Sequence, residues 1–115
     1  MNRSAARREA FAAEAAAARM AMAAGDRGAA YHHLERAHIL GQPWAGLHSW
    51  SHWAMLKLAV RDGDAREAAG QILRLAAGGL LSLAGWLPAG NTGRARVSAI
   101  RPMPVPEDLR RLCET

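Results

Sequence analysis

The sequence predicts an all-α protein: a four-helix bundle made of two helical hairpins, followed by an extended proline-rich strap. Half of its 115 residues are hydrophobic but only 5% are aromatic, and much of the apolar content is alanine, the strongest helix former. β-Branched residues are scarce before Val97, which argues against a sheet. The pair Gly-Asp, a helix stop followed by a helix cap, occurs at Gly25-Asp26 and again at Gly63-Asp64.

The first hairpin is expected on either side of Gly25. Its first helix should begin with a Ser4 cap and run to about Ala24, and its second should begin with an Asp26 cap and run to Leu40. Apolar residues recur at helical spacing in both segments. The expected core positions are Phe11, Ala15, Ala18, Met22, Leu34, Ala37 and Leu40.

The second hairpin is expected on either side of Gly63. Its first helix should begin between Pro43 and Leu47 and end near Arg61. Its second helix should begin after Asp64, which together with Glu67 resembles a capping box, and should end before Pro88. The expected apolar positions are Trp53, Leu56, Val60, Ile72, Leu75, Leu80 and Leu83. The spacing of the two hairpins is close to that of tetratricopeptide repeats, so we expect a similar geometry.

Residues 88–106 have a different character. The sequence G-N-T-G at residues 90–93 is typical of a turn. Pro102, Pro104 and Pro106 alternate with other residues, which predicts an extended strap packed along the bundle. A last helical turn is expected over residues 107–112. The length predicts a single domain over residues 1–115.

Charge and cysteine content narrow the class of protein. The net charge is +5, but the arginines are scattered, so we expect a solvated basic surface and no nucleic-acid partner. Cys113 is the only cysteine, which fits a cytoplasmic protein and excludes a thiolate metal cluster. No signal peptide is recognisable, and the apolar stretch from Leu75 to Leu87 is too short to be a transmembrane segment.

The chain's candidate ligands lie on both sides of the turn at Gly41 and Pro43. Glu35 and His38 are three residues apart, and His48 and His52 are four apart. Each spacing places both side chains on one face of a helix. Two antiparallel helices would bring the four side chains to matching heights, as a mononuclear metal site requires. His32 and His33 are expected to lie on the surface, and Gln42 to be a turn residue.

These ligands favour a small metal-binding protein that senses, buffers or delivers a divalent transition metal. Nitrogen and oxygen donors do not discriminate among Zn²⁺, Ni²⁺, Co²⁺, Cu²⁺ and Fe²⁺. The alternative is a metal-free helical-repeat module that binds a protein partner or forms a homodimer. A metal-dependent enzyme, or a peripheral nucleic-acid or membrane binder, ranks third. No phosphate-binding loop or Ser/His/Asp set occurs, and whether the protein is an enzyme stays open.

The motifs resemble a family of small bacterial proteins that is classed only as a domain of unknown function. They are L-E-R-A-H-I-L-G-Q at residues 34–42, H-x-x-x-H at His48 and His52, a G-Q pair at residues 70–71, G-N-T-G at residues 90–93 and R-P-M-P-x-P-x-D-L at residues 101–109. In the family pattern a further glycine follows G-N-T-G, and this chain has Arg94 at that position. The resemblance supports the fold boundaries and implies no activity.

Overall fold

The computed structural model describes residues 2–83, 90–97 and 101–114, with side chains for 2–77, 90–97 and 101–114. It contains five α-helices and no strand among these residues, which confirms the all-α prediction. The helices are α1 (Arg3–Ala23), α2 (Arg27–Gly41), α3 (Ala45–Asp62), α4 (Ala65–Leu83) and α5 (Glu107–Cys113).

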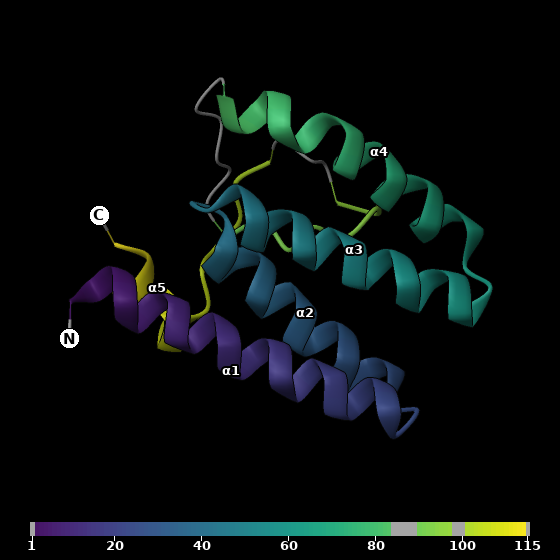
Figure 1. The fold of residues 1–115 in the computed structure, drawn as a ribbon, viewed down its shortest axis with the longest axis horizontal. Helices are drawn as coiled ribbons and strands as arrows, with labels where there is room; N and C mark the ends of the chain where they lie inside the picture. The colour runs from purple at the N-terminus through teal and green to yellow at the C-terminus, as the bar shows by residue number, and fades with distance from the viewer. Residues whose placement is uncertain (1, 84–89, 98–100, 115) are drawn as a thin grey trace.

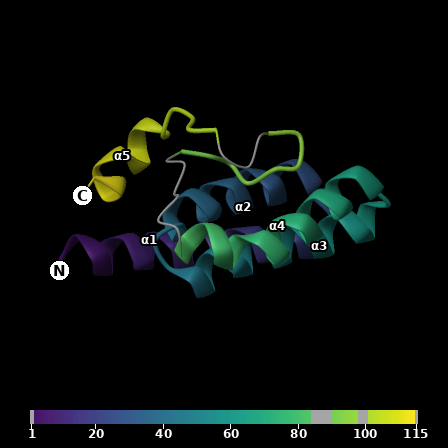
Figure 2. The same cartoon turned by 90° about the horizontal axis from the view of Figure 1, so that it is seen from above.

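The four long helices lie side by side in chain order (Figure 1). Helix α1 packs on α2, α2 on α3 and α3 on α4. The described part of the chain after residue 90 lies on one face of these helices, and α5 packs against α1 and α2 (Figure 2). The two ends of the chain meet, because the Arg3 guanidinium donates to the Glu114 carbonyl over 3.2 Å. The C-terminal helix therefore packs against the two helices that begin the chain.

The helix starts follow the capping rules, with one correction. Asp26 caps α2 by accepting from the Ala29 amide at 3.0 Å, as predicted. Asp64 accepts from the Glu67 amide at 3.0 Å. Ser4 was the wrong residue for the cap of α1: the cap lies two residues earlier, and the Asn2 side chain accepts from the Ala5 amide at 2.7 Å.

The core of the first hairpin agrees with the predicted positions. One cluster of buried residues joins α1, α2 and α3, and a second joins α1, α2 and α5. Leu109 of α5 is buried in the second cluster, and Val105 packs against it. The expected residues Phe11, Ala15, Ala18, Leu34, Ala37 and Leu40 are all buried, and Met22 is partly buried.

Two of the three apolar positions predicted to be buried on α3 are wrong, and the third, Leu56, is half-buried. Trp53 and Val60 are 50% and 65% exposed, and Ile72 on α4 is 57% exposed. The buried face of α3 instead carries Ser51 and His52 among its apolar residues. The residues on the exposed face and those on the buried face of α3 both recur at helical spacing. The spacing therefore predicts a helix but does not show which face is buried. The predicted core positions Leu80 and Leu83 lie outside the described side chains.

Three expectations about the second half of the chain stay predictions. The end of α4 near Leu87 and the strap over residues 88–106 include residues 84–89 and 98–100, which lie outside the description. Within residues 94–97 the chain turns, with the Val97 amide donating to the Arg94 carbonyl at 3.0 Å. Tetratricopeptide-like geometry likewise stays a prediction. In the part of the chain that the structure covers, no helix has the length and apolarity to cross a membrane.

Candidate metal centre

Three histidines meet where α2 reverses into α3. Helix α2 ends at Gly41, and the Trp44 amide donates to the Gly41 carbonyl at 3.0 Å, which closes the turn. His38 lies in the last turn of α2, and His48 lies in the first turn of α3. His52 follows one turn later on the same face, because four residues are close to one helical turn. The turn thus brings side chains from two helices to one point.

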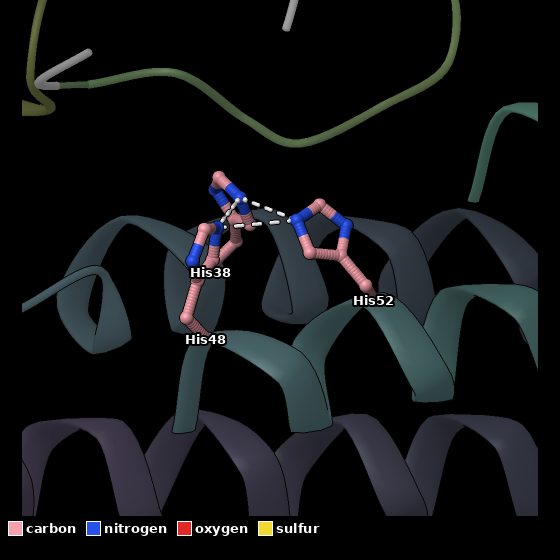
Figure 3. A group of neighbouring side chains, drawn as sticks. All are labelled: His38, His48 and His52. Carbon is pink, nitrogen blue, oxygen red and sulfur yellow. Dashed lines mark hydrogen bonds between the residues drawn. The ribbon is translucent and has the colours of Figure 1, made fainter. Parts of the chain in front are cut away.

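The Nε2 atoms of the three rings face one another (Figure 3). They are separated by 3.0 Å between His38 and His48, 3.1 Å between His48 and His52, and 3.2 Å between His38 and His52. His38 and His52 are buried, at 3% and 4% exposure, and His48 is half-buried. The described residues contain no other group of three or more His, Cys, Asp or Glu side chains that is close enough to hold a metal ion.

Hydrogen bonds fix the tautomers of two of these rings. His38 Nδ1 lies 2.7 Å from the Asn91 carbonyl oxygen, and His52 Nδ1 lies 2.7 Å from Gln71 Oε1. Both oxygens can only accept, so each Nδ1 carries the hydrogen and donates it. In the neutral rings Nε2 then has a bare lone pair. The His38–His52 contact therefore sets two lone pairs against each other at 3.2 Å.

The orientation of the Gln71 amide is fixed as well. Its Nε2 donates to Glu67 Oε2 at 2.7 Å and to the Gly93 carbonyl at 2.8 Å, and it lies 3.3 Å from Met55 Sδ. The amide nitrogen thus has acceptors around it, which leaves Oε1 facing His52. This chain from Glu67 through Gln71 to His52 is the kind of support that holds a metal-binding imidazole in place.

Residues 90–97, here named the covering loop, close the site from the side opposite the helices (Figure 3). Gly93 lies against His38, and a Cβ on this glycine would come within 2.6 Å of the ring. Gly70 of α4 likewise leaves room for the covering loop, because a Cβ there would lie 2.3 Å from the Ala95 Cβ. Both glycines allow the backbone of the covering loop to approach the helices closely.

A buried ion-pair network holds the covering loop in place. Glu67 Oε1 accepts from Arg94 Nε at 2.7 Å, and Glu67 Oε2 accepts from the Ala95 amide at 2.9 Å. Arg94 also reaches Glu35 at 3.2 Å, and its guanidinium lies over the Tyr31 ring, 3.6 Å from the centroid. Burial raises the pKa of Glu67, but the hydrogen bonds from Arg94, Gln71 and Ala95 outweigh burial and leave that pKa below its ordinary value.

The histidines are held neutral. Burial, followed by the neighbouring His52 and His48, puts the pKa of His38 well below its ordinary value. Burial also lowers the pKa of His48, and it lowers the pKa of His52 to about 4 although the hydrogen bond that His52 donates to Gln71 acts in the opposite direction. Neutral imidazole is the form that binds a metal ion, so protons compete weakly for this site.

The structure does not bring the fourth predicted ligand, Glu35, into this group. Its carboxylate pairs with Arg94 instead. Three residues on a helix differ by about 60° in direction, so Glu35 and His38 diverge once an arginine attracts the carboxylate. His32 is exposed as expected, whereas His33 is half-buried and bonded to Glu14 at 2.7 Å. Gln42 is buried at the C-cap of α2.

The triangle of nitrogens has the size of a metal coordination face. An ion with metal–nitrogen bonds of about 2.0–2.1 Å and ligand angles between about 90° and 110° separates its nitrogens by about 2.8–3.4 Å. The three observed separations, 3.0, 3.1 and 3.2 Å, lie within this range. A cation at the centre would also remove the repulsion between the lone pairs.

Sequence reasoning missed most of the residues that support the histidines. The sequence indicates Gln71 only as part of a resemblance, the G-N-T-G segment only as a turn and part of that resemblance, and Glu67 only as a capping residue. One sequence pattern does indicate Glu67 and Gln71: they are four residues apart on a helix, which places both polar groups on one face. The contacts between α4 and the covering loop carry no such local pattern.

Comparison with known proteins agrees with the family resemblance. A family model described as "Protein of unknown function (DUF3703)" matches residues 5–113. No curated protein and no solved structure matches the chain. Since the match covers nearly its whole length, the chain belongs to the DUF3703 family.

Proposed function

We propose that this chain is a small cytoplasmic protein that binds one divalent transition-metal ion through the Nε2 atoms of His38, His48 and His52, in order to sense, buffer or deliver it. The observation that carries the proposal is the pair of fixed tautomers. Two Nδ1 atoms donate to oxygens, so the bare Nε2 atoms face each other in a buried space. Buried lone pairs in contact are unfavourable unless a cation lies between them.

Glu35 is not part of the proposed set, because Arg94 occupies its carboxylate. Three imidazoles suit Zn²⁺, Cu²⁺, Ni²⁺, Co²⁺ and Fe²⁺, and the donor set alone does not choose among them. The hydrogen bonds that His38 and His52 donate to Asn91 and Gln71 are those expected of histidine ligands, since such rings almost always donate their other N–H to an oxygen.

A titration of chelator-treated protein with Zn²⁺ or Co²⁺ tests the proposal. We expect one ion per chain, and we expect His48→Gln and His52→Gln to weaken binding by at least about tenfold each. His32→Gln, on the exposed side of α2, is the matched control and should bind as the wild type does. Wild-type affinity no tighter than that of a His48→Gln/His52→Gln double variant with an unchanged circular dichroism spectrum would refute it.

The second candidate, a protein-interaction module, is favoured by a groove of about 510 Å³ between α1 and the start of α3. Its floor includes Phe11 and Leu47. Arg8 and Arg19 line it, with guanidinium groups 4.6 Å and 5.0 Å from the Trp44 and Trp50 ring centroids. Neither arginine forms an ion pair with a described residue, so an acidic amphipathic helix is the partner that fits.

The groove is tested with a synthetic amphipathic helix that carries glutamates on both sides of a leucine stripe. We expect saturable binding that Arg8→Glu/Arg19→Glu abolishes and that His48→Gln leaves unchanged. Arg66→Glu, an exposed charge reversal on α4, is the control for net charge. Equal binding to wild type and the double charge reversal would rule out this groove.

A further inference from the structure

The candidate metal centre has three protein donors and no fourth. Among the described residues, the three histidines form the only group of three or more His, Cys, Asp or Glu side chains that is close enough to hold a metal ion. The residues outside the description, 1, 84–89, 98–100 and 115, and the undescribed side chains of 78–83 include no His, Cys, Asp or Glu. Structural zinc sites have four protein ligands, whereas sites with three keep a position for an exchangeable ligand. A bound ion would therefore take its next ligand from solution.

The charge around the site favours an anion as that ligand. Three neutral imidazoles leave a divalent ion with its full charge. The nearby carboxylate of Glu67 is bonded to Gln71 and paired with Arg94, so it does not neutralise the ion. A further cation, Arg74, lies one turn after Gln71 on α4 and reaches the Val97 carbonyl at 2.6 Å.

Arg74 has no acidic partner in the part of the chain that the structure describes. Its guanidinium donates to the Gly70 and Val97 carbonyls, and its Nε is buried without a hydrogen bond. It follows Gln71 by three residues, about one turn of α4, and Gln71 accepts from His52 Nδ1 at 2.7 Å, so Arg74 lies on the face of α4 that borders the site. Arg74 thus adds positive charge on the side of α4, where the carboxylate of Glu67 is already paired with Arg94.

Access to the centre lies on the side of His48. His38 is covered by Gly93, and His52 is buried between α3 and Gln71. His48 is only half-buried and is in the first turn of α3. The edge of the centre at His48 is therefore its most exposed side.

We propose that the metal ion held by His38, His48 and His52 has an exchangeable coordination position that binds small monodentate anions, with Arg74 contributing to their attraction. This inference rests on the proposed metal binding. It favours delivery over permanent structural binding, since an incoming ligand can join the ion before a histidine leaves. In the exchange, the anion replaces a bound water and no covalent bond within the protein changes.

Cobalt(II) and azide test the proposal in two steps. Co²⁺ is first added to chelator-treated protein until its visible absorption saturates, and azide is then titrated at constant ionic strength. We expect a saturable change in the cobalt spectrum. We also expect Arg74→Met to weaken azide binding by about threefold, the effect of one partly screened charge, while the control Arg66→Met leaves azide binding unchanged.

The cobalt titration and the azide titration test different claims, so their negative results can be told apart. A saturating cobalt spectrum that azide does not alter would overturn the exchangeable position and leave metal binding intact. An absence of any cobalt spectrum would overturn metal binding and this inference with it. Equal azide affinity in wild type and Arg74→Met, with the azide change present, would remove Arg74 from the proposal.

Discussion

Gly93 sets how closely the covering loop approaches the histidines. Its φ of +81° lies in the left-handed region, and a Cβ there would meet the His38 ring at 2.6 Å. Gly63 has a similar φ of +71° with no atom near its missing Cβ. Gly63→Ala should therefore cost only the left-handed backbone penalty of about 1–2 kcal/mol in the free energy of unfolding. Gly93→Ala should cost more and should also weaken metal binding.

Urea unfolding and a Zn²⁺ titration of both variants separate the two effects. The Gly63→Ala variant carries the backbone strain without the contact, so any extra loss in Gly93→Ala belongs to the approach of the covering loop to His38. Identical losses of stability and unchanged zinc affinity in the two variants would show that this approach is unimportant.

Gln71 is expected to act on the metal through His52. Its Oε1 accepts the His52 Nδ1 hydrogen at 2.7 Å, which keeps Nε2 free to bind. Gln71→Leu should weaken zinc affinity by about 10- to 100-fold, as the loss of such supporting groups does at other metal sites. Ile72→Ala, at the adjacent exposed position, is the control. If both variants bind zinc as the wild type does, His52 does not depend on this hydrogen bond.

The three histidines should make the metal-free protein sensitive to acid. Their folded-state pKa values lie below the ordinary value of 6.5, and that of His52 is about 4. Between these pH values the unfolded chain binds more protons than the folded one. Stability is thus fully present above pH 6.5 and falls as the pH is lowered toward about 4. Urea unfolding with a chelator at pH 7.5 and pH 5 measures this loss.

A triple variant with glutamine at positions 38, 48 and 52 identifies the source of this pH dependence. It should lose most of the decline in stability between pH 7.5 and pH 5, whereas His32→Gln should keep it. A decline of the same size in wild type and the triple variant would assign the acid sensitivity to other groups.

At the scale of elements, Arg94 is the link between the covering loop and the helices. It joins Glu67 on α4 and Glu35 on α2, at 2.7 Å and 3.2 Å. Arg94→Ala would leave Glu67 as a buried, unpaired charge, which is destabilising. We expect faster amide hydrogen exchange over residues 91–95 and faster loss of bound metal to a chelator. Arg96→Ala, on the same loop but exposed, should change neither rate.

The boundaries of the helices could be predicted from the sequence more accurately than the faces that these helices bury. Gly-Asp turns and caps located the helices to within a few residues, because capping is a local interaction. On α3 the predicted stripe of Trp53 and Val60 is exposed, while the buried face includes His52. A hydrophobic pattern cannot anticipate a buried polar site, since such a site violates the pattern for functional reasons.

The same limit explains the outcome for the candidate ligands. The convergence of His38, His48 and His52 could be predicted because helical spacing and one short turn fix their relative heights. The pairing of Glu35 with Arg94 could not be predicted, because Arg94 is distant in sequence and reaches Glu35 only through the covering loop. The support from Gln71 and Asn91 depends on the same non-local packing.

For the whole molecule, a bound ion would join α2 and α3 directly, and it would reach the covering loop through the hydrogen bond that His38 Nδ1 donates to the Asn91 carbonyl. Metal binding should therefore stabilise the packing of these parts together. An ion concentration a hundredfold above the dissociation constant adds about 2.7 kcal/mol to the free energy of unfolding. Whether the ion binds among these three histidines therefore decides whether this coupling exists.

The most direct test is anomalous diffraction at the zinc edge from crystals of the zinc-loaded protein. The account predicts one strong peak per chain, about 2.0–2.1 Å from the Nε2 atoms of His38, His48 and His52, with Nδ1 of His38 and His52 still bonded to Asn91 and Gln71. A peak bound to other residues, or no peak among these three histidines at saturating zinc, would contradict it.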